Sequence, residues 1–107
     1  MKFEPLYRIV RRIPVGRVVG YGQLGELSDP PFSPRAVGRA MAYCPDDVPW
    51  WRVLGGNGLI LTYRRDPVLG ALQIARLKDE GVPVDELRRV DMDRFQWLPT
   101  DNELRDD

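Results

Sequence analysis

The sequence predicts a mainly α domain with a small β element, of the winged helix-turn-helix kind. Three observations predict this class: helical spacing of apolar residues near the start, two short helical segments around a break, and a glycine-rich turn between apolar stretches. A chain of 107 residues with 43% apolar content has room for one domain but not for two. We therefore expect one domain over residues 1–99, followed by an acidic, disordered tail over residues 100–107.

The first predicted helix covers residues 5–13, with Pro5 near its first turn. Its apolar side chains recur at positions i, i+3, i+4 and i+7, the spacing of one helix face: Leu6, Ile9, Val10 and Ile13. The segment Pro14-Val15-Gly16 ends this helix, and the apolar pair Val18-Val19 favours a short extended stretch. The chain therefore begins with one amphipathic helix that needs a partner for its apolar face.

Two short helices around a break form the predicted helix-turn-helix. Residues 21–27 predict the first of them, and Asp29-Pro30-Pro31 interrupts the helical pattern. Ser33 fits an N-cap and Pro34 fits the first helical position, so a further helix is predicted to run to Tyr43. This second helix is rich in arginine and small residues, which suits a helix that approaches DNA.

A hairpin and a longer helix complete the pattern. Val53-Leu54 and Leu59-Ile60-Leu61 flank the turn Gly55-Gly56-Asn57-Gly58, which predicts a hairpin where a wing would lie. Asp66 and Pro67 are expected to begin the longer helix, and Gly81 to end it. Its predicted apolar face consists of Val68, Ala71, Leu72 and Ala75, extended by Leu77. The remainder, through Trp97, is predicted as mixed strand and loop.

Residue counts exclude several kinds of chemistry. The chain has no histidine, which removes Ser-His-Asp and Cys-His catalysis and every histidine-containing metal site. The single cysteine, Cys44, can form neither an internal disulfide nor a thiolate metal cluster, and this fits a reducing cytoplasm. No apolar run approaches the roughly 20 residues of a membrane span, and the start lacks a signal peptide's apolar segment. We expect no metal, no cofactor and no membrane association.

The formal net charge of zero conceals two opposite halves. Residues 1–65 hold ten Lys or Arg against five acidic residues, which leaves +5, and residues 66–107 hold six against eleven, which leaves −5. Fourteen of the sixteen basic residues are arginine, a residue that favours bidentate and stacked contacts with phosphates and bases. A genome rich in GC would give the same arginine bias without any function. The asymmetry predicts a basic binding face in the first segment.

Adjacent tryptophans at positions 50 and 51 form the most unusual local feature. In an extended backbone, successive side chains point to opposite sides, so Trp50 and Trp51 cannot both face one core. One of them is expected to be partly exposed or to line a cavity, although both could pack in a small, loop-rich core. An indole beside a groove rimmed by arginine is a stacking surface for a nucleobase.

Three motifs, taken in order, resemble the DNA-binding domain of O6-alkylguanine-DNA alkyltransferases. They are Tyr21-Gly22-Gln23-Leu24, Pro34-Arg35-Ala36-Val37-Gly38-Arg39-Ala40-Met41 and Val48-Pro49-Trp50-Trp51-Arg52-Val53. The resemblance covers roughly residues 4–82. It implies that the helix-turn-helix enters the minor groove of double-stranded DNA. It also implies that a flipped O6-alkylguanine is held in a pocket at the third motif.

Trp50 stands where that family has the cysteine of a Pro-Cys-His-Arg-Val motif, and Trp51 stands at the histidine position. Replacement of the cysteine resembles the alkyltransferase-like proteins, which bind the lesion, do not repair it and hand it to nucleotide excision repair proteins. The chemistry agrees, because alkyl transfer requires an activated thiolate and an indole supplies none. Cys44 falls at a hinge position of the family, has no neighbouring base in the sequence and is interpreted as structural.

The resemblance also implies roles for individual residues. Arg35 matches the arginine finger that fills the space of the extruded base, Tyr21 the tyrosine that crowds the phosphate beside the lesion, and Arg39 and Arg52 are further candidates for DNA contact. The expected alkylguanine pocket contains Trp50, Val53, Tyr63 and either Arg64 or Arg65. For each of these residues a plainer role remains open, such as phosphate contact by Arg35 or core packing by Trp50.

The sequence thus predicts a monomeric, non-enzymatic sensor of O6-alkylguanine. Two alternatives remain open: a winged-helix transcription regulator that reads the major groove, and a residual methyltransferase that uses Cys44. Small residues on the second helix of the pair and the indole at the pocket position count against the first alternative. The absence of histidine counts against the second.

Overall fold

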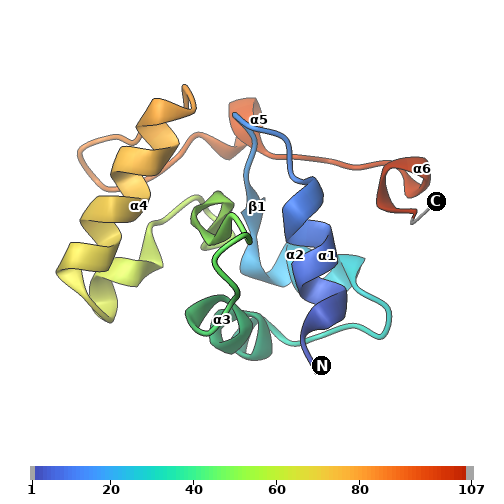
Figure 1. Ribbon diagram of the computed structural model, residues 1–107. Coiled ribbons are helices and arrows are strands. Elements are labelled where there is room, and N and C mark those ends of the chain that lie inside the picture. The colour runs from blue at the N-terminus through green and yellow to red at the C-terminus, as the bar shows by residue number, and fades with distance from the viewer. Residues whose placement is uncertain (1, 106–107) are drawn as a thin grey trace.

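A computed structural model describes residues 2–105 and shows a mainly helical domain with one small sheet (Figure 1). The predicted fold class is confirmed. In chain order the elements are α1 (Glu4–Arg12), β1 (Val19–Gly20), α2 (Tyr21–Leu27), α3 (Pro34–Ala42), the 3-10 turn η1 (Trp50–Arg52), β2 (Val53–Leu54), the 3-10 turn η2 (Leu61–Arg64), α4 (Pro67–Asp79), α5 (Met92–Phe95) and α6 (Asp101–Leu104). No helix among the described residues is long and apolar enough to cross a bilayer.

The helix boundaries follow the capping residues that the sequence indicated. The Ser33 side chain accepts a hydrogen bond from the Ala36 N–H at 3.1 Å, and α3 begins at Pro34 as predicted. The Asp66 side chain accepts from the Val68 N–H at 2.9 Å, and α4 begins at the next residue. Helix α2 spans the predicted residues 21–27, and α1 lies within one residue of its predicted bounds. Local capping chemistry therefore decides where these helices begin.

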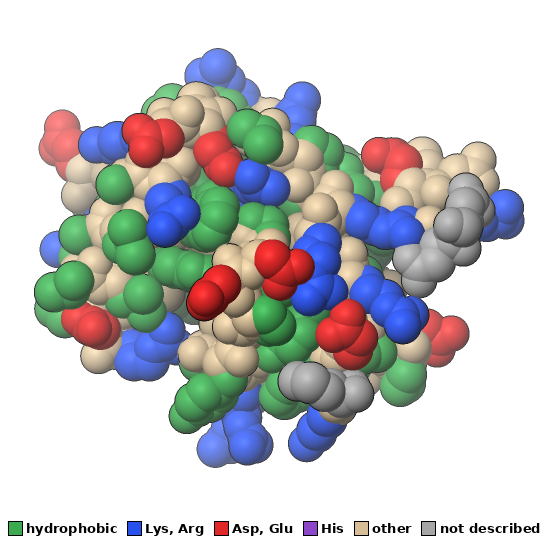
Figure 2. Space-filling view, in the orientation of Figure 1, with side chains coloured by type: hydrophobic (Ala, Val, Ile, Leu, Met, Phe, Trp, Pro, Cys, Tyr) green, Lys and Arg blue, Asp and Glu red, His purple; other side chains and the backbone are tan. Residues whose placement is uncertain are grey.

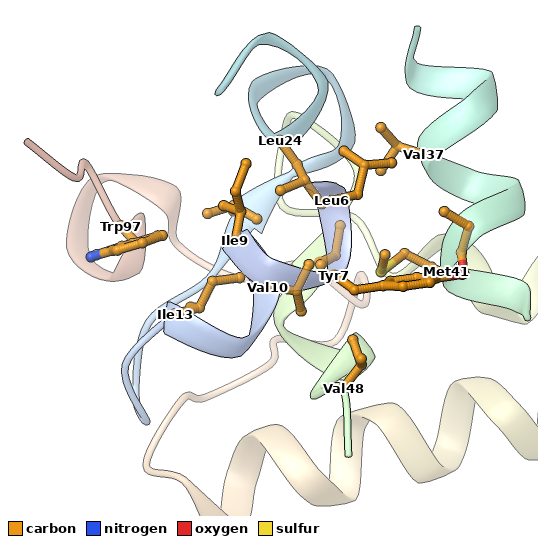
Figure 3. Packing of buried hydrophobic residues seen from close by; sticks show 13 residues of the cluster. Leu6, Tyr7, Ile9, Val10, Ile13, Leu24, Val37, Met41, Val48 and Trp97 are labelled. Atoms are coloured by element: carbon orange, nitrogen blue, oxygen red, sulfur yellow. The ribbon is translucent and has the colours of Figure 1, made fainter. Parts of the chain in front are cut away.

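The two short strands separate two apolar clusters. The first cluster, shown in Figure 3, joins α1, α2 and α3 and includes Tyr7 and Trp97. The second lies beneath α4 and includes Leu77 and Val90. Val19 and Val53 face the first cluster, whereas their chain neighbours Val18 and Leu54 face the second. This alternation places β1 and β2 between the helix-turn-helix and α4.

The predicted hairpin is wrong. Strand β2 pairs in parallel with β1, in the register Val19–Val53, and not with the chain that returns after the glycine-rich turn. The returning Leu59 instead bridges Arg89. Gly58 has a φ of +87° and a Cβ there would lie 2.1 Å from the Val90 carbonyl oxygen, so the turn is pressed against distant chain. The sequence pattern located the turn but could not identify these distant partners.

The chain after α4 was predicted as mixed strand and loop. It contains isolated bridges at Arg89 and Gln96 and the short helix α5, over residues 92–95. Two main-chain hydrogen bonds connect this segment to Val18: the Val18 N–H donates to the Phe95 carbonyl at 2.9 Å, and the Trp97 N–H donates to the Val18 carbonyl at 2.7 Å. The segment therefore completes both clusters from the far end of the sequence.

The predicted apolar face of α4 is also wrong, since Val68 is 76% exposed and Leu72 is exposed as well. Leu77 is buried as predicted, and the other buried positions are Gly70 and Gln73. Gly70 leaves space for the ring of Tyr63, because a Cβ at position 70 would lie only 2.5 Å from that ring. The buried polar residue of this face, Gln73, has hydrogen-bond partners in η1, in β2 and in η2. A count of apolar side chains could not find a helix face made of a glycine and an amide.

The predicted disordered tail is ordered over residues 100–105. Thr100 caps α6 in a capping box with Glu103, and Leu104 packs against the first cluster. The Arg12 guanidinium donates to the carbonyl oxygens of Glu103 and Arg105, which fastens α6 to α1. Residues 106–107 lie outside the described residues. The tail is thus ordered, despite its acidic composition, by the Thr100 cap, the packing of Leu104 and the hydrogen bonds from Arg12.

Candidate nucleic-acid interface

Three of the residues predicted to contact DNA surround one cavity beside α3, the helix at the lower edge of the molecule in Figure 1. The cavity has a volume of about 380 Å³. Tyr21 comes from the start of α2, and Arg35 and Arg39 come from one face of α3. The full lining is Tyr21, Arg35, Gly38, Arg39, Ala42, Tyr43, Leu61, Thr62 and Arg65. We call this the arginine cavity.

A second cavity, also of about 380 Å³, lies beside the tryptophan pair. It is lined by Met41, Ala42, Cys44, Pro45, Asp46, Trp50, Trp51, Arg65, Leu69, Leu72 and Arg76. We call it the tryptophan cavity. Ala42 and Arg65 belong to the walls of both cavities. Helix α3 and the turn before α4 therefore bring the predicted DNA-contacting side chains next to the predicted pocket.

Trp50 and Trp51 pack edge to face, with their ring centroids 6.0 Å apart and their planes at 85°. Their backbone is the 3-10 turn η1 and not the extended chain that the prediction assumed. The two rings nevertheless do not face one core, because Trp50 packs against the first cluster and Trp51 against the second. Both rings are half-buried and both line the tryptophan cavity.

The Trp51 ring contacts two guanidinium groups, one from its own turn η1 and one from α4. The guanidinium carbon of Arg76 lies 4.6 Å from the centroid of the Trp51 ring, and that of Arg52 lies 5.5 Å from it. Arg76 projects from the last turn of α4. The wall of the tryptophan cavity is thus an aromatic ring stacked with guanidinium groups.

The prediction that Arg52 contacts DNA is wrong. Its Nε and Nη2 donate to the Glu80 carboxylate at 2.9 and 2.5 Å, and its Nη1 donates to the Ile13 carbonyl at 2.9 Å. The two side chains of this pair are only 11% and 13% exposed. Arg52 therefore joins the end of α1 to the end of α4 inside the protein.

The electrostatics of Glu80 reflect this pairing. Burial by itself would raise the pKa of the Glu80 carboxyl, but the Arg52 guanidinium, with smaller effects of Trp51 and Arg76, outweighs burial and lowers the pKa. Glu80 is therefore ionised at neutral pH. A charged pair in this position has a structural role.

Two predicted pocket residues, Val53 and Tyr63, line neither cavity. Val53 is buried in β2 within the first cluster. The Tyr63 ring packs against Gly70 of α4 and lies 3.6 Å beneath the guanidinium carbon of Arg88. Both residues were expected in the pocket because of the resemblance to the alkyltransferases. The fold turns their side chains toward α4 and the core.

The structure distinguishes the two arginines that the sequence left open. Arg64 lines neither cavity, whereas Arg65 lines both. Arg65 also faces Tyr21 across the arginine cavity. Burial raises the pKa of the Tyr21 hydroxyl, and the positive charge of Arg65 partly offsets that increase. Tyr21 is therefore a neutral phenol that can donate a hydrogen bond.

The basic segment does not act as one uniform surface. Arg11 pairs with Glu4 and Asp47, Arg17 donates to the Arg94 carbonyl at 2.8 Å, and other arginines are held by α6 or Glu80. The arginines that border the cavities are Arg35, Arg39, Arg65 and Arg76. Figure 2 shows basic side chains projecting from the lower edge of the molecule, where α3 lies. The positive charge available to a phosphate backbone is therefore concentrated beside α3.

Gln73 is a residue that sequence reasoning missed. It is fully buried on α4, and its side-chain amide nitrogen donates to the Trp51 and Val53 carbonyl oxygens at 3.0 and 3.2 Å. Its amide oxygen accepts from the Thr62 hydroxyl at 2.7 Å. These bonds connect α4 to the tryptophan turn and to η2. In the sequence, the signal for a buried Gln73 was its spacing: it lies three positions after Gly70 and four positions before Leu77, on the same helix face.

We expect Gln73→Met to destabilise the protein by about 2 kcal/mol, because two buried carbonyl groups and one hydroxyl lose their partner while the volume is nearly kept. Urea unfolding followed by tryptophan fluorescence measures the difference. A change below about 0.5 kcal/mol would show that these carbonyl groups find other donors. Gln96→Met, at a half-buried amide, serves as the matched control.

Cys44 lies on the wall of the tryptophan cavity, closer to Trp50 than its separate loop suggested. Burial raises the pKa of its thiol, the nearby carboxylates of Asp46 and Asp47 raise it further, and a main-chain hydrogen bond offsets only part of this increase. Cys44 is therefore a protonated thiol at neutral pH. Among residues 2–105, no three His, Cys, Asp or Glu side chains group closely enough to hold a metal ion.

Comparison with known proteins agrees with this arrangement. The family described as "6-O-methylguanine DNA methyltransferase, DNA binding domain" matches residues 2–82. The chain belongs to this family. The family predicted from the three motifs is thereby confirmed.

Members similar to this chain include proteins named for base flipping. The "DNA base-flipping protein" of Vibrio parahaemolyticus is 29% identical over 96 residues, which cover 88% of this chain and 93% of that protein. "Alkyltransferase-like protein 1" of Schizosaccharomyces pombe is 31% identical over 104 residues, which cover 91% and 94% of the two chains. A crystal structure of the S. pombe protein with damaged DNA containing O6-carboxymethylguanine matches with a TM-score of 0.77 at 30% identity, over 91% of this chain and 94% of that chain.

Proposed function

We propose that this protein is a non-enzymatic sensor that binds double-stranded DNA through the minor groove and flips O6-alkylguanine out of the duplex. One observation carries the proposal: Tyr21, Arg35, Arg39 and Arg65 surround one cavity, and that cavity shares two wall residues with the tryptophan cavity. Family membership and the similarity to base-flipping proteins support it.

Each of these residues has a role in the proposed mechanism. Arg39 and the exposed arginines near it contact phosphates, which gives affinity without sequence preference. Arg35 enters the duplex and occupies the space that the extruded base leaves. Tyr21 crowds the neighbouring phosphate, and its neutral hydroxyl can donate to a phosphate oxygen. The flipped base enters beside Arg65 and places its O6 substituent against Trp50.

Selectivity for the lesion follows from the cost of flipping. Extrusion of a base costs a few kcal/mol, and the cost is lower for a base whose pairing is already weakened by alkylation. The apolar residues among the mixed walls of the tryptophan cavity, which include Met41 and Trp50, add contact with the alkyl group. We therefore propose that the damaged base is held longer than guanine.

We also propose that the bound alkyl group is not transferred. Trp50 stands at the position of the family's reactive cysteine, and an indole ring is not a nucleophile of that kind. The remaining thiol, Cys44, is protonated, and among the described residues no cationic group pairs with it. A residual methyltransferase would need a thiolate at this site.

The test compares two duplexes that differ only in guanine or O6-methylguanine at one position. We expect tighter binding to the methylated duplex, measured by fluorescence anisotropy at fixed salt, and an unchanged protein mass afterwards. Equal affinities would contradict lesion sensing and favour the transcription-regulator alternative. A mass increase of one methyl group on Cys44 would show that the protein is an enzyme.

We further propose that the protein acts as a monomer in the cytoplasm and delivers the lesion to nucleotide excision repair proteins. The single cysteine suits a reducing compartment. Because no transfer removes the alkyl group, a separate repair activity has to excise the marked nucleotide. Co-precipitation of excision repair proteins with the lesion-bound protein, but not with the protein on unmodified DNA, is the expected result.

A further inference from the structure

Tyr43 is an aromatic residue whose position the fold does not explain. It follows the last residue of α3 as the C-cap, and 81% of its surface is exposed. Among the described residues, no hydrogen bond, ion pair or ring contact engages its side chain. A tyrosine ring left in water contributes little to folding, so this ring is available to a partner.

The place of Tyr43 indicates which partner. Arg35, Arg39 and Tyr43 are spaced by four residues each, so they lie in one row along α3. All three line the arginine cavity, and Arg65 and Tyr21 lie on its other walls. The exposed ring therefore stands on the rim of the arginine cavity, which adjoins the tryptophan cavity that receives the O6 substituent in the proposed function, on which this inference rests.

The separation of Tyr43 from Arg35 along α3 bears on which nucleotide the ring can contact. Tyr43 is eight residues beyond Arg35, which corresponds to about 12 Å along the helix axis. Base pairs in a duplex are spaced by about 3.4 Å, so this separation along α3 exceeds the spacing of a single base step. The ring therefore suits contact with a nucleotide that has left the stack and lies beside Arg65, where the two cavities meet.

We propose that Tyr43 is a further nucleotide-contacting residue, which stacks on the extruded nucleotide at the outer rim of the arginine cavity. The flat face of a base or its sugar meets the phenol ring on one side, and the Arg65 guanidinium lies on another wall of the same cavity. The contact forms only after flipping. Tyr43 therefore adds to the affinity for damaged DNA and not to the affinity for intact duplex.

The test measures binding of Tyr43→Ala, Tyr43→Phe and wild type to the O6-methylguanine duplex and to the matching guanine duplex. We expect Tyr43→Ala to bind the lesion duplex about tenfold more weakly, because it loses one ring stacked on a base. Its affinity for the guanine duplex should stay within about twofold of wild type. Tyr43→Phe keeps the ring and should match wild type on both. Leu98→Ala, at an apolar side chain that is 73% exposed and lines neither cavity, is the control and should change neither affinity.

Two results would overturn the inference while leaving the proposed function intact. If wild type discriminates and Tyr43→Ala binds both duplexes as tightly as wild type does, the ring does not contact the flipped nucleotide. If Tyr43→Ala loses the same factor on both duplexes, the ring contacts the intact duplex instead. Equal binding of wild type to both duplexes would overturn the proposed function and this inference together. Because Tyr43 is so exposed, loss of folding does not confuse the outcome, and a thermal melt of each variant checks this.

Discussion

Arg35→Ala should lose about a hundredfold in affinity for the O6-methylguanine duplex and most of its preference for that duplex over guanine. The side chain is exposed on the first turn of α3 and borders the arginine cavity. Without it nothing fills the space of the extruded base, so the unstacking cost of a few kcal/mol is no longer offset. Fluorescence anisotropy titrations at one salt concentration measure both affinities.

Two variants separate this role from plain charge. Arg39→Ala removes a cation from the next turn of the same helix face, and should weaken binding to both duplexes by a similar factor and lower the salt dependence. Arg64→Ala removes a cation that lines neither cavity, and should change little. If Arg35→Ala retains the full preference for the lesion, Arg35 is only a phosphate contact.

Arg52→Met should destabilise the protein by about 3–5 kcal/mol, because it leaves the Glu80 carboxylate buried without its partner. In a domain of this size we expect the melting temperature to fall by more than about 10 °C. Differential scanning calorimetry measures the effect. The double variant Arg52→Met/Glu80→Met should recover much of the loss, since it removes both charges. A change below about 1 kcal/mol in the single variant would contradict the structural role of this pair.

The same pair has a defined pH dependence. The pKa of Glu80 is lowered in the folded protein, so its contribution is fully present above the ordinary glutamate pKa of about 4.3. This contribution is lost as the pH falls through the lower folded value. In Arg52→Met the Glu80 carboxyl is buried without its partner, which raises its pKa in that variant, so the stability difference between wild type and Arg52→Met should narrow as the solution is acidified from pH 7. A difference that widens on acidification would show that another group dominates.

The sequence determined those features that depend on neighbouring residues. Ser33-Pro34 and Asp66-Pro67 begin α3 and α4 as predicted, because capping and the fixed φ of proline act within one turn. Three local motifs also identified the family, and with it Tyr21, Arg35 and Arg39, which the fold brings to one cavity. The absence of histidine was enough to exclude most catalytic designs.

Tertiary contacts decided where individual side chains of the site point. In the sequence Arg52 is one more cation beside Trp51, but in the fold its side chain points inward and pairs with Glu80 at the end of α4. Tyr63 follows the pocket motif, but Gly70 leaves the space that draws its ring beneath α4. Such outcomes depend on residues 7 to 28 positions away, and local spacing carries no information about them.

The helix-turn-helix and its arginines were therefore determined by the sequence alone, since each depends on residue type and local order. The parallel pairing of β1 with β2, the amide of Gln73 beneath the tryptophan turn and the position of Arg65 between two cavities were decided only by the folded chain. The physical reason is that a buried polar group is satisfied by whichever partner packing brings within hydrogen-bond distance. That partner can lie anywhere in the sequence.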